Sequence, residues 1–209
     1  PHRFWKYLAG TGIKLEGTFK ILVAYPEQVA YGVKAIFLIG ILYTLTVAGL
    51  ALARVPISAP AILPIAPDQY YFYQTFFQIP VFILAWILAS GLVQLLSKPF
   101  KGNGSFEGTL AALGFAMTVP MFVTWIPETI MTGMVLAGVM SAEEWIELTS
   151  RSIFGRIFNF LYQFVAIAWL YLLILISTAV AQNLRWWKAM IAGTLTFIIF
   201  GLMLFVFIR

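Results

Sequence analysis

Cysteine is absent from this sequence, histidine occurs once, and charged side chains make up only 10% of the 209 residues. Without thiols there are no disulfides, thiolate nucleophiles or thiolate-ligated metals. The single histidine, His2, cannot build an imidazole cluster around a metal ion. An average soluble domain is charged at about a quarter of its positions, so the composition excludes an ordinary soluble domain. We expect neither a metal nor a cofactor here.

Long apolar runs dominate what is present, with 62% hydrophobic residues and a mean hydropathy of +0.94. A helix of about 20 apolar residues crosses the roughly 30 Å hydrocarbon core of a bilayer. The sequence therefore predicts an all-α, polytopic membrane bundle of five transmembrane helices. We expect an integral multi-pass protein, in the cell or inner membrane if the source is prokaryotic. The predicted spans are Val33–Ala53, Phe76–Leu96, a third segment within Gly108–Met140, Ile157–Val180 and Ala189–Ile208.

The third apolar segment is too long for one upright span and contains Pro120 and Pro127. Proline removes a helical hydrogen bond, so we expect a segment kinked or broken at these positions, with a span to Ile126 and a shorter interfacial helix beyond. Ser141 and Glu144 then form a capping-box pattern. This pattern predicts a helix that begins at Ala142 along the membrane surface.

Basic residues predict the orientation, because lysine and arginine collect on the cytoplasmic side of membrane proteins. With a cytoplasmic N-terminus, nine of the 13 basic residues lie inside and Arg54, Arg151, Arg156 and Arg209 lie outside. Five spans then place the C-terminus outside. The net charge of +5 is thus explained by a membrane face, and we expect no nucleic-acid partner.

Residues 1–32 form an N-terminal amphipathic or interfacial segment before the membrane domain of residues 33–209. Phe19, Leu22 and neighbouring apolar residues share one helical face, whereas Lys14 and Lys20 can reach lipid headgroups. This pattern predicts a surface helix that contacts anionic lipids at the cytoplasmic face. The alternative is a helix packed on the cytoplasmic ends of the spans.

The stretch "KPFKGNGSFEG" interrupts the apolar sequence and resembles a phosphate-binding loop in its glycines. A dinucleotide fingerprint needs a preceding strand, and a Walker loop needs Gly-Lys followed by Ser or Thr, so both interpretations fail. Between two membrane helices, glycines with positive φ permit a tight reversal, and Asn103 or Ser105 can cap the next helix. The alternative is a lipid-headgroup or partner contact at Lys98, Lys101, Gly102, Gly104 and Ser105.

Few polar residues fall within the predicted spans. Glu128 follows Pro127, and we expect it at the outer interface as the first-turn acid of the next helix. The alternative is a buried carboxylate paired with Arg151 or Arg156 in a proton or ion pathway. Asn159 and Gln163 are one turn apart, so they share a face on which hydrogen bonds to another helix are expected.

The segment "GNGSFEGTLAALGFAMTVP" resembles the glycine-rich turn and the following Gly-aromatic and proline pattern of the Yip family, five-span membrane proteins named for interacting with Ypt/Rab GTPases. "QIPVFILAWILASGLVQLL" is similar to the second spans of prokaryotic members. The residues that carry the first pattern are Gly102, Gly104, Ser105, Phe106, Leu110, Gly114, Phe115 and Pro120.

The resemblance implies a cytoplasmic N-terminus, an outside C-terminus and no recognised catalytic residue. Eukaryotic members carry an acidic Asp-Leu-Tyr-Gly-Pro segment that this sequence lacks. We expect a non-enzymatic membrane protein of Yip type that organises membrane, or binds other membrane proteins or a second copy of itself. The alternative is a permease or a lipid or solute translocator, or a transmembrane subunit of a larger transport or energy-transducing complex.

Overall fold

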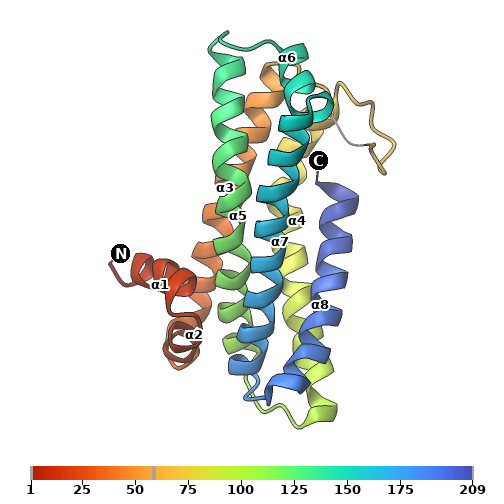
Figure 1. The fold of residues 1–209 in the computed structure, drawn as a ribbon. Helices are drawn as coiled ribbons and strands as arrows, with labels where there is room; N and C mark the ends of the chain where they lie inside the picture. Colours follow the sequence, from red (N-terminus) through yellow and green to blue (C-terminus); the bar gives the residue numbers. More distant parts are fainter. Residues whose placement is uncertain (1, 58–59, 209) are drawn as a thin grey trace.

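Five long apolar helices form a bundle in the computed structural model, which describes residues 2–57 and 60–208 (Figure 1). All regular secondary structure of these residues is helical. The prediction of five spans is therefore confirmed, with boundaries shifted by a few residues. The five helices are α3 (Gln28–Leu52), α4 (Tyr70–Ser97), α5 (Phe106–Leu136), α7 (Ile153–Ala181) and α8 (Trp186–Phe207).

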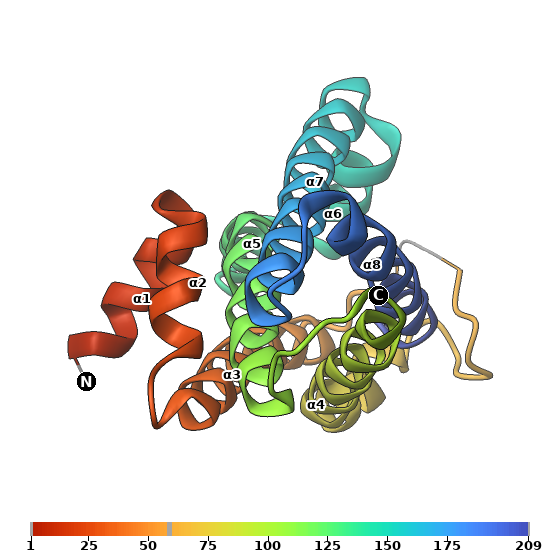
Figure 2. The ribbon, with the colours of Figure 1, turned by 90° about the horizontal axis from the view of Figure 1, so that it is seen from below.

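Helix α5 lies at the centre of the bundle, where it contacts α3, α4 and α7 (Figure 2). The most apolar window of α5 is 61% buried, compared with 22% for α8, which packs on α4 and α7 at the edge. Small residues explain this position, since Ala111, Ala112 and Ala116 are completely buried and let neighbouring helices approach closely. The bundle is thus built around one span.

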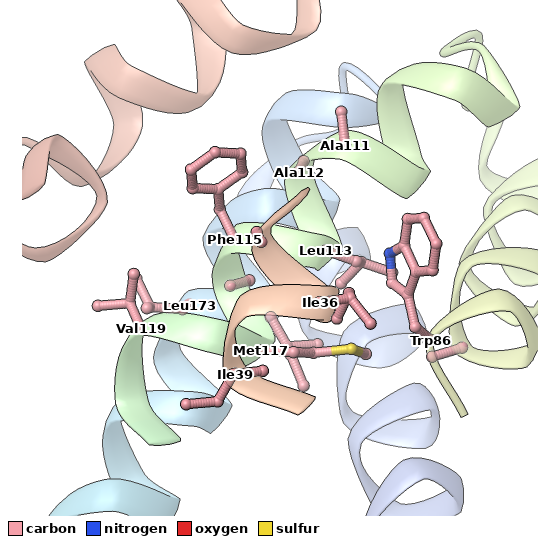
Figure 3. Close-up of a cluster of buried hydrophobic side chains, with 14 of the residues drawn as sticks. Ile36, Ile39, Trp86, Ala111, Ala112, Leu113, Phe115, Met117, Val119 and Leu173 are labelled. Carbon is pink, nitrogen blue, oxygen red and sulfur yellow. The ribbon is translucent and has the colours of Figure 1, made fainter. Parts of the chain in front are cut away.

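Part of the main core lies where α3, α4 and α5 meet (Figure 3). Ile39 of α3, Trp86 of α4, and Leu113 and Met117 of α5 gather there, and each is at most 5% exposed. The Trp86 indole Nε1 donates to the Leu110 carbonyl at 2.8 Å. A buried tryptophan thereby satisfies its polar atom while its ring fills the space between two helices.

Two glycines bring the backbones of α3 and α5 together. A Cβ atom added to Gly114 would lie 2.9 Å from the Gly32 carbonyl oxygen, and one added to Gly32 would lie 2.9 Å from the Ala111 Cα atom. Both distances are too short for a side chain. Helices α3 and α5 therefore cross in backbone contact near the end of the bundle at which α3 begins.

Helix α5 continues from Phe106 to Leu136 with Pro120 and Pro127 inside it. The predicted break, with a separate helix beyond Ile126, is therefore wrong. Each proline removes one helical donor, and helices α3 and α7 pack against α5. A kink at these prolines stays a prediction.

Helices α1 (His2–Ile13) and α2 (Leu15–Val23) lie beside the bundle, toward the end at which α3 begins (Figure 1). Their apolar faces belong to the main core, since Phe19 and Leu22 are completely buried and the Phe4 ring lies 5.6 Å from that of Phe115. Lys14 is exposed, and Lys20 pairs with Glu16 at 2.6 Å. The placement of these helices at a lipid surface stays a prediction.

The short helix α6 (Ala142–Ile146) lies at the opposite end of the bundle from the α4–α5 loop (Figure 1). Its predicted capping box is present. The Ser141 amide donates to the Glu144 carboxylate at 2.7 Å, and the Glu144 amide donates to the Ser141 hydroxyl at 3.1 Å. These bonds lower the Glu144 pKa below its usual value. Which end of the bundle faces the cytoplasm stays a prediction.

Candidate functional site

The glycine-rich stretch forms a compact turn between α4 and α5. Ser105 caps α5 by accepting the Gly108 amide at 3.0 Å, as the sequence predicts. The predicted role of the glycines is wrong, however, because the positive φ of 64° belongs to Lys101. Gly104 is needed for a close approach: a Cβ atom there would lie 1.6 Å from the Ala181 carbonyl oxygen.

Gln182, directly after α7, joins this turn to the neighbouring α7–α8 loop. Its side-chain nitrogen donates to Gln94 Oε1 and to Thr109 Oγ1, both at 2.6 Å, and its carbonyl accepts the Asn103 amide at 3.2 Å. Gln94 in turn donates to the Gly104 carbonyl at 3.0 Å. The sequence analysis missed Gln182, although an amide side chain at the end of an apolar run could have marked it.

These hydrogen bonds occupy backbone N–H groups of the turn that a bound anion would need. The Lys101 and Gly102 amides donate to carbonyls within the turn, and Asn103 donates to Gln182. Lys98 and Lys101 are exposed at the same end as Arg185, which is also exposed. Lys188 donates to the Phe100 carbonyl at 3.1 Å. The geometry supports a structural turn with a basic rim, and a lipid-headgroup or partner contact at Lys98, Lys101, Gly102, Gly104 and Ser105 stays a prediction.

Glu128 lies inside the continuous helix α5, so its predicted place in the first turn of a new helix is wrong. Its side chain is partly buried. The hydroxyl groups of Tyr43 of α3, Tyr71 of α4 and Tyr162 of α7 lie within electrostatic range of its carboxylate. Tyrosines from three helices therefore lie near one acidic residue. The sequence analysis did not find these tyrosines, because they are far apart in the sequence.

A series of hydrogen bonds connects α3 to α5 next to Glu128. The Tyr43 hydroxyl bonds to Thr124 and to the Met121 carbonyl. One turn further along α3, Thr46 bonds to Thr129 at 2.7 Å and accepts the Trp125 indole N–H at 3.1 Å. In hydrocarbon such bonds between helices fix their relative register.

Asn159 and Gln163 share one face of α7 as predicted, but Gln163 donates to Asn159 of its own helix at 3.2 Å. Within the described residues neither side chain bonds to another helix. The Gln163 side chain is exposed. It lies about ten residues, or roughly 15 Å along the helix axis, from the first residue of α7. An exposed amide therefore lies well inside an apolar span.

Neither the curated proteins nor the solved structures that were compared gave a match to this chain. The family model of the Yip1 domain matches residues 22–208, which include all five apolar helices, the α4–α5 turn and Gln182. This match, together with the five-helix bundle, establishes an integral, multi-pass membrane protein. The chain belongs to the Yip1 domain family.

Proposed function

We propose that this Yip1-domain protein is a non-enzymatic membrane protein that binds another transmembrane helix through the outer half of α7, the half that begins at Ile153. One observation carries the proposal: the exposed Gln163 amide in a helix that is long and apolar enough to cross a membrane. A polar side chain in hydrocarbon is stabilised most when a second helix supplies hydrogen-bond partners. Each such bond typically contributes about 0.5–2 kcal/mol.

The residues around Gln163 favour a helix as the partner. Arg156, Phe160, Gln163 and Ile167 follow the spacing of one helical face, and all four are exposed. The Phe160 and Phe164 rings are stacked with centroids 5.9 Å apart, which gives this face a rigid aromatic ridge. We name the surface of Arg156, Phe160, Gln163, Phe164 and Ile167 the α7 ridge.

Cross-linking in native membranes tests the proposal, because the chain has no cysteine and each introduced thiol is therefore unique. We expect Gln163→Cys, labelled with benzophenone maleimide and irradiated, to give a specific adduct, because the excited benzophenone inserts into C–H bonds of whichever helix lies beside it. Leu202→Cys on α8 is the matched control, since Leu202 is also exposed in an apolar span. An adduct of twice the chain mass identifies a second copy as the partner, whereas any other discrete mass identifies a different membrane protein.

The cross-linking result can also contradict the proposal. Equal adduct patterns from the two positions would show random collision in the bilayer. No adduct from Gln163→Cys would show that the α7 ridge faces lipid alone. A second variant, Gln163→Leu, should preserve folding and weaken isolation of the partner with the wild-type chain, because it keeps the apolar contact and removes the amide.

Translocation of a solute is the second candidate function, and the carboxylate of Glu128 within the bundle favours it. Solute flux into proteoliposomes that contain the purified chain tests this candidate. Flux that Glu128→Gln abolishes would support it. Equal leakage from liposomes with and without the protein would contradict it.

A further inference from the structure

A cleft of about 710 Å³ opens between α2 and the loop that joins α7 to α8. Its volume falls within the roughly 300–1,000 Å³ range of small-molecule sites. Helix α2 packs against α7, so the cleft lies between the N-terminal helices and the membrane-spanning bundle. It contains no residue of the α7 ridge and lies toward the other end of α7.

One side of the cleft is charged. Glu16 and Lys20 line it from α2, where their side chains pair at 2.6 Å and are 66% and 65% exposed. An ammonium group has three N–H donors and a carboxylate has two oxygens, so the pair keeps donors and acceptors for a ligand. No other charged side chain among the described residues lines the cleft. The cleft therefore offers one positive and one negative charge side by side.

The opposite side of the cleft is apolar. Ile176, Ala179 and Val180 line it from one face of α7, at three- and four-residue spacing. All three side chains are partly buried. Ile176 lies roughly 7 Å along the helix axis before Ala181, the last residue of α7. A ligand that matches both sides has charged groups of both signs and an apolar part.

The cleft also lies where two spans end. Helix α7 ends at Ala181 and α8 begins at Trp186, and both helices are apolar enough to cross a membrane. Trp186 lines the cleft and is 49% exposed. Tryptophan rings collect at the level of the lipid headgroups. The molecules beside this cleft in a bilayer are therefore phospholipids, at the level of their headgroups.

We propose that this cleft binds one phospholipid with a zwitterionic headgroup that carries a primary amine, such as phosphatidylethanolamine. The lipid phosphate pairs with Lys20, the ammonium group donates to Glu16, and the first part of the acyl chains packs on Ile176 and Val180. A net anionic headgroup fits less well, because Glu16 would face a second negative charge. This inference is independent of the partner helix proposed at the α7 ridge.

Native mass spectrometry of the full chain in detergent tests the proposal, because it counts the lipid molecules that stay bound. We expect one phosphatidylethanolamine per chain. Phosphatidylglycerol with the same acyl chains should be retained about three- to fivefold less, which is the effect of one partly exposed charge pair. Diacylglycerol has the same chains without a headgroup and should be retained least, because it contacts the apolar side alone.

Charge variants connect the bound lipid to α2. Lys20→Gln should lower retention of phosphatidylethanolamine about three- to fivefold. Glu16→Gln should remove the preference for phosphatidylethanolamine over phosphatidylglycerol. Both side chains are exposed, so these changes should preserve the fold. Lys14→Gln is the matched control, since Lys14 is an exposed lysine directly before α2 that does not line the cleft.

A variant that fills the cleft tests the apolar side. Ala179→Phe should abolish retention of phosphatidylethanolamine, because the ring would occupy the space of the acyl chains. Ala168→Phe is the matched control, since Ala168 is exposed on the same helix outside the cleft. Thermal unfolding of each variant separates a filled cleft from a loss of fold.

Each outcome decides the proposal. Retention of none of the three lipids overturns it, and so does equal retention of all three or a preference for phosphatidylglycerol. Binding of phosphatidylethanolamine that neither Lys20→Gln nor Ala179→Phe changes would place the lipid elsewhere on the protein. A discrete protein that co-purifies with the wild type and is lost with Ala179→Phe would show that another chain, and not a lipid, occupies the cleft.

Discussion

At the residue scale, the α4–α5 turn shows where sequence patterns identify a position and misjudge its cause. The glycines and Ser105 predicted a capped turn, and that turn is present. The left-handed residue is Lys101, whereas Gly104 allows α7 to approach. Local sequence indicates that a reversal occurs. It does not show that Ala181 packs against Gly104, and this contact is the reason that glycine is required there.

Replacing Gly104 with alanine should lower the free energy of unfolding by at least about 2 kcal/mol, because the new methyl group meets the Ala181 carbonyl. Thermal unfolding in detergent, followed by circular dichroism, measures the change. Gly91→Ala in α4 is the control, since nothing lies within 4 Å of its added Cβ atom. Equal melting of Gly104→Ala and the wild type would contradict the backbone contact.

The capping box at Ser141 should respond to pH. The Glu144 pKa is lowered in the folded chain by the Ser141 amide and hydroxyl. A lowered folded pKa means that the stabilisation is fully present above the unfolded pKa and is lost as the pH falls through the folded pKa. The NMR shift of the Ser141 amide should therefore change at acidic pH, and Glu144→Gln should remove this titration. Glu143→Gln, the matched control, should leave it unchanged.

At the element scale, apolar length predicted all five spans, because a helix that crosses hydrocarbon must satisfy its own backbone. Contacts between spans were less predictable. The prolines suggested a broken third segment, but α5 is continuous and packs against α3 and α7. Gly32 preceded the predicted first span, so its contact with Gly114 was not anticipated. Helix existence follows from composition, whereas crossing points depend on the partner helix.

Gly114→Ala should destabilise the bundle by about 1–3 kcal/mol, because its methyl group would press on the Gly32 backbone. Gly133→Ala, in the same helix, meets nothing within 4 Å and should be neutral or stabilising by about 0.5–1 kcal/mol. Chemical denaturation of both variants in the same detergent provides the comparison. A cost that is equal at the two positions would argue against a backbone crossing at Gly114.

Glu128 and Gln163 show a similar limit for the candidate sites. Sequence identified both residues as polar positions in apolar segments. It could not place Tyr43, Tyr71 and Tyr162 near one carboxylate, since these residues come from three helices. It also predicted bonds from Gln163 to another helix, whereas the bond found is within α7. Spacing along one helix defines a face but does not identify what covers it.

At the scale of the whole molecule, the two loops joined by Gln182 share one end of the bundle, and α6 lies at the other (Figure 1). The distribution of basic residues predicts that the Gln182 end is cytoplasmic. The structure thus shows that the Gln182 loops and α6 lie at opposite ends of the bundle. The charge argument assigns each end its side of the membrane.

Single cysteines can determine this orientation. With a membrane-impermeant maleimide on intact cells, Glu147→Cys should react at once, whereas Lys101→Cys should react only after the membrane is permeabilised. Both positions are exposed, so access to solvent does not bias the comparison. The reverse pattern would invert the orientation, and labelling of both from outside would contradict the five-span topology.

Helix α8 packs on α4 and α7 at the edge of the bundle, and its apolar window is the least buried of the five. A chain that stops before Trp186 would keep the α3–α5–α7 centre and the Gln182 bonds. It would then have an even number of passes and return its C-terminus to the side on which α3 begins. The last helix therefore determines the side of the membrane on which Phe207 lies.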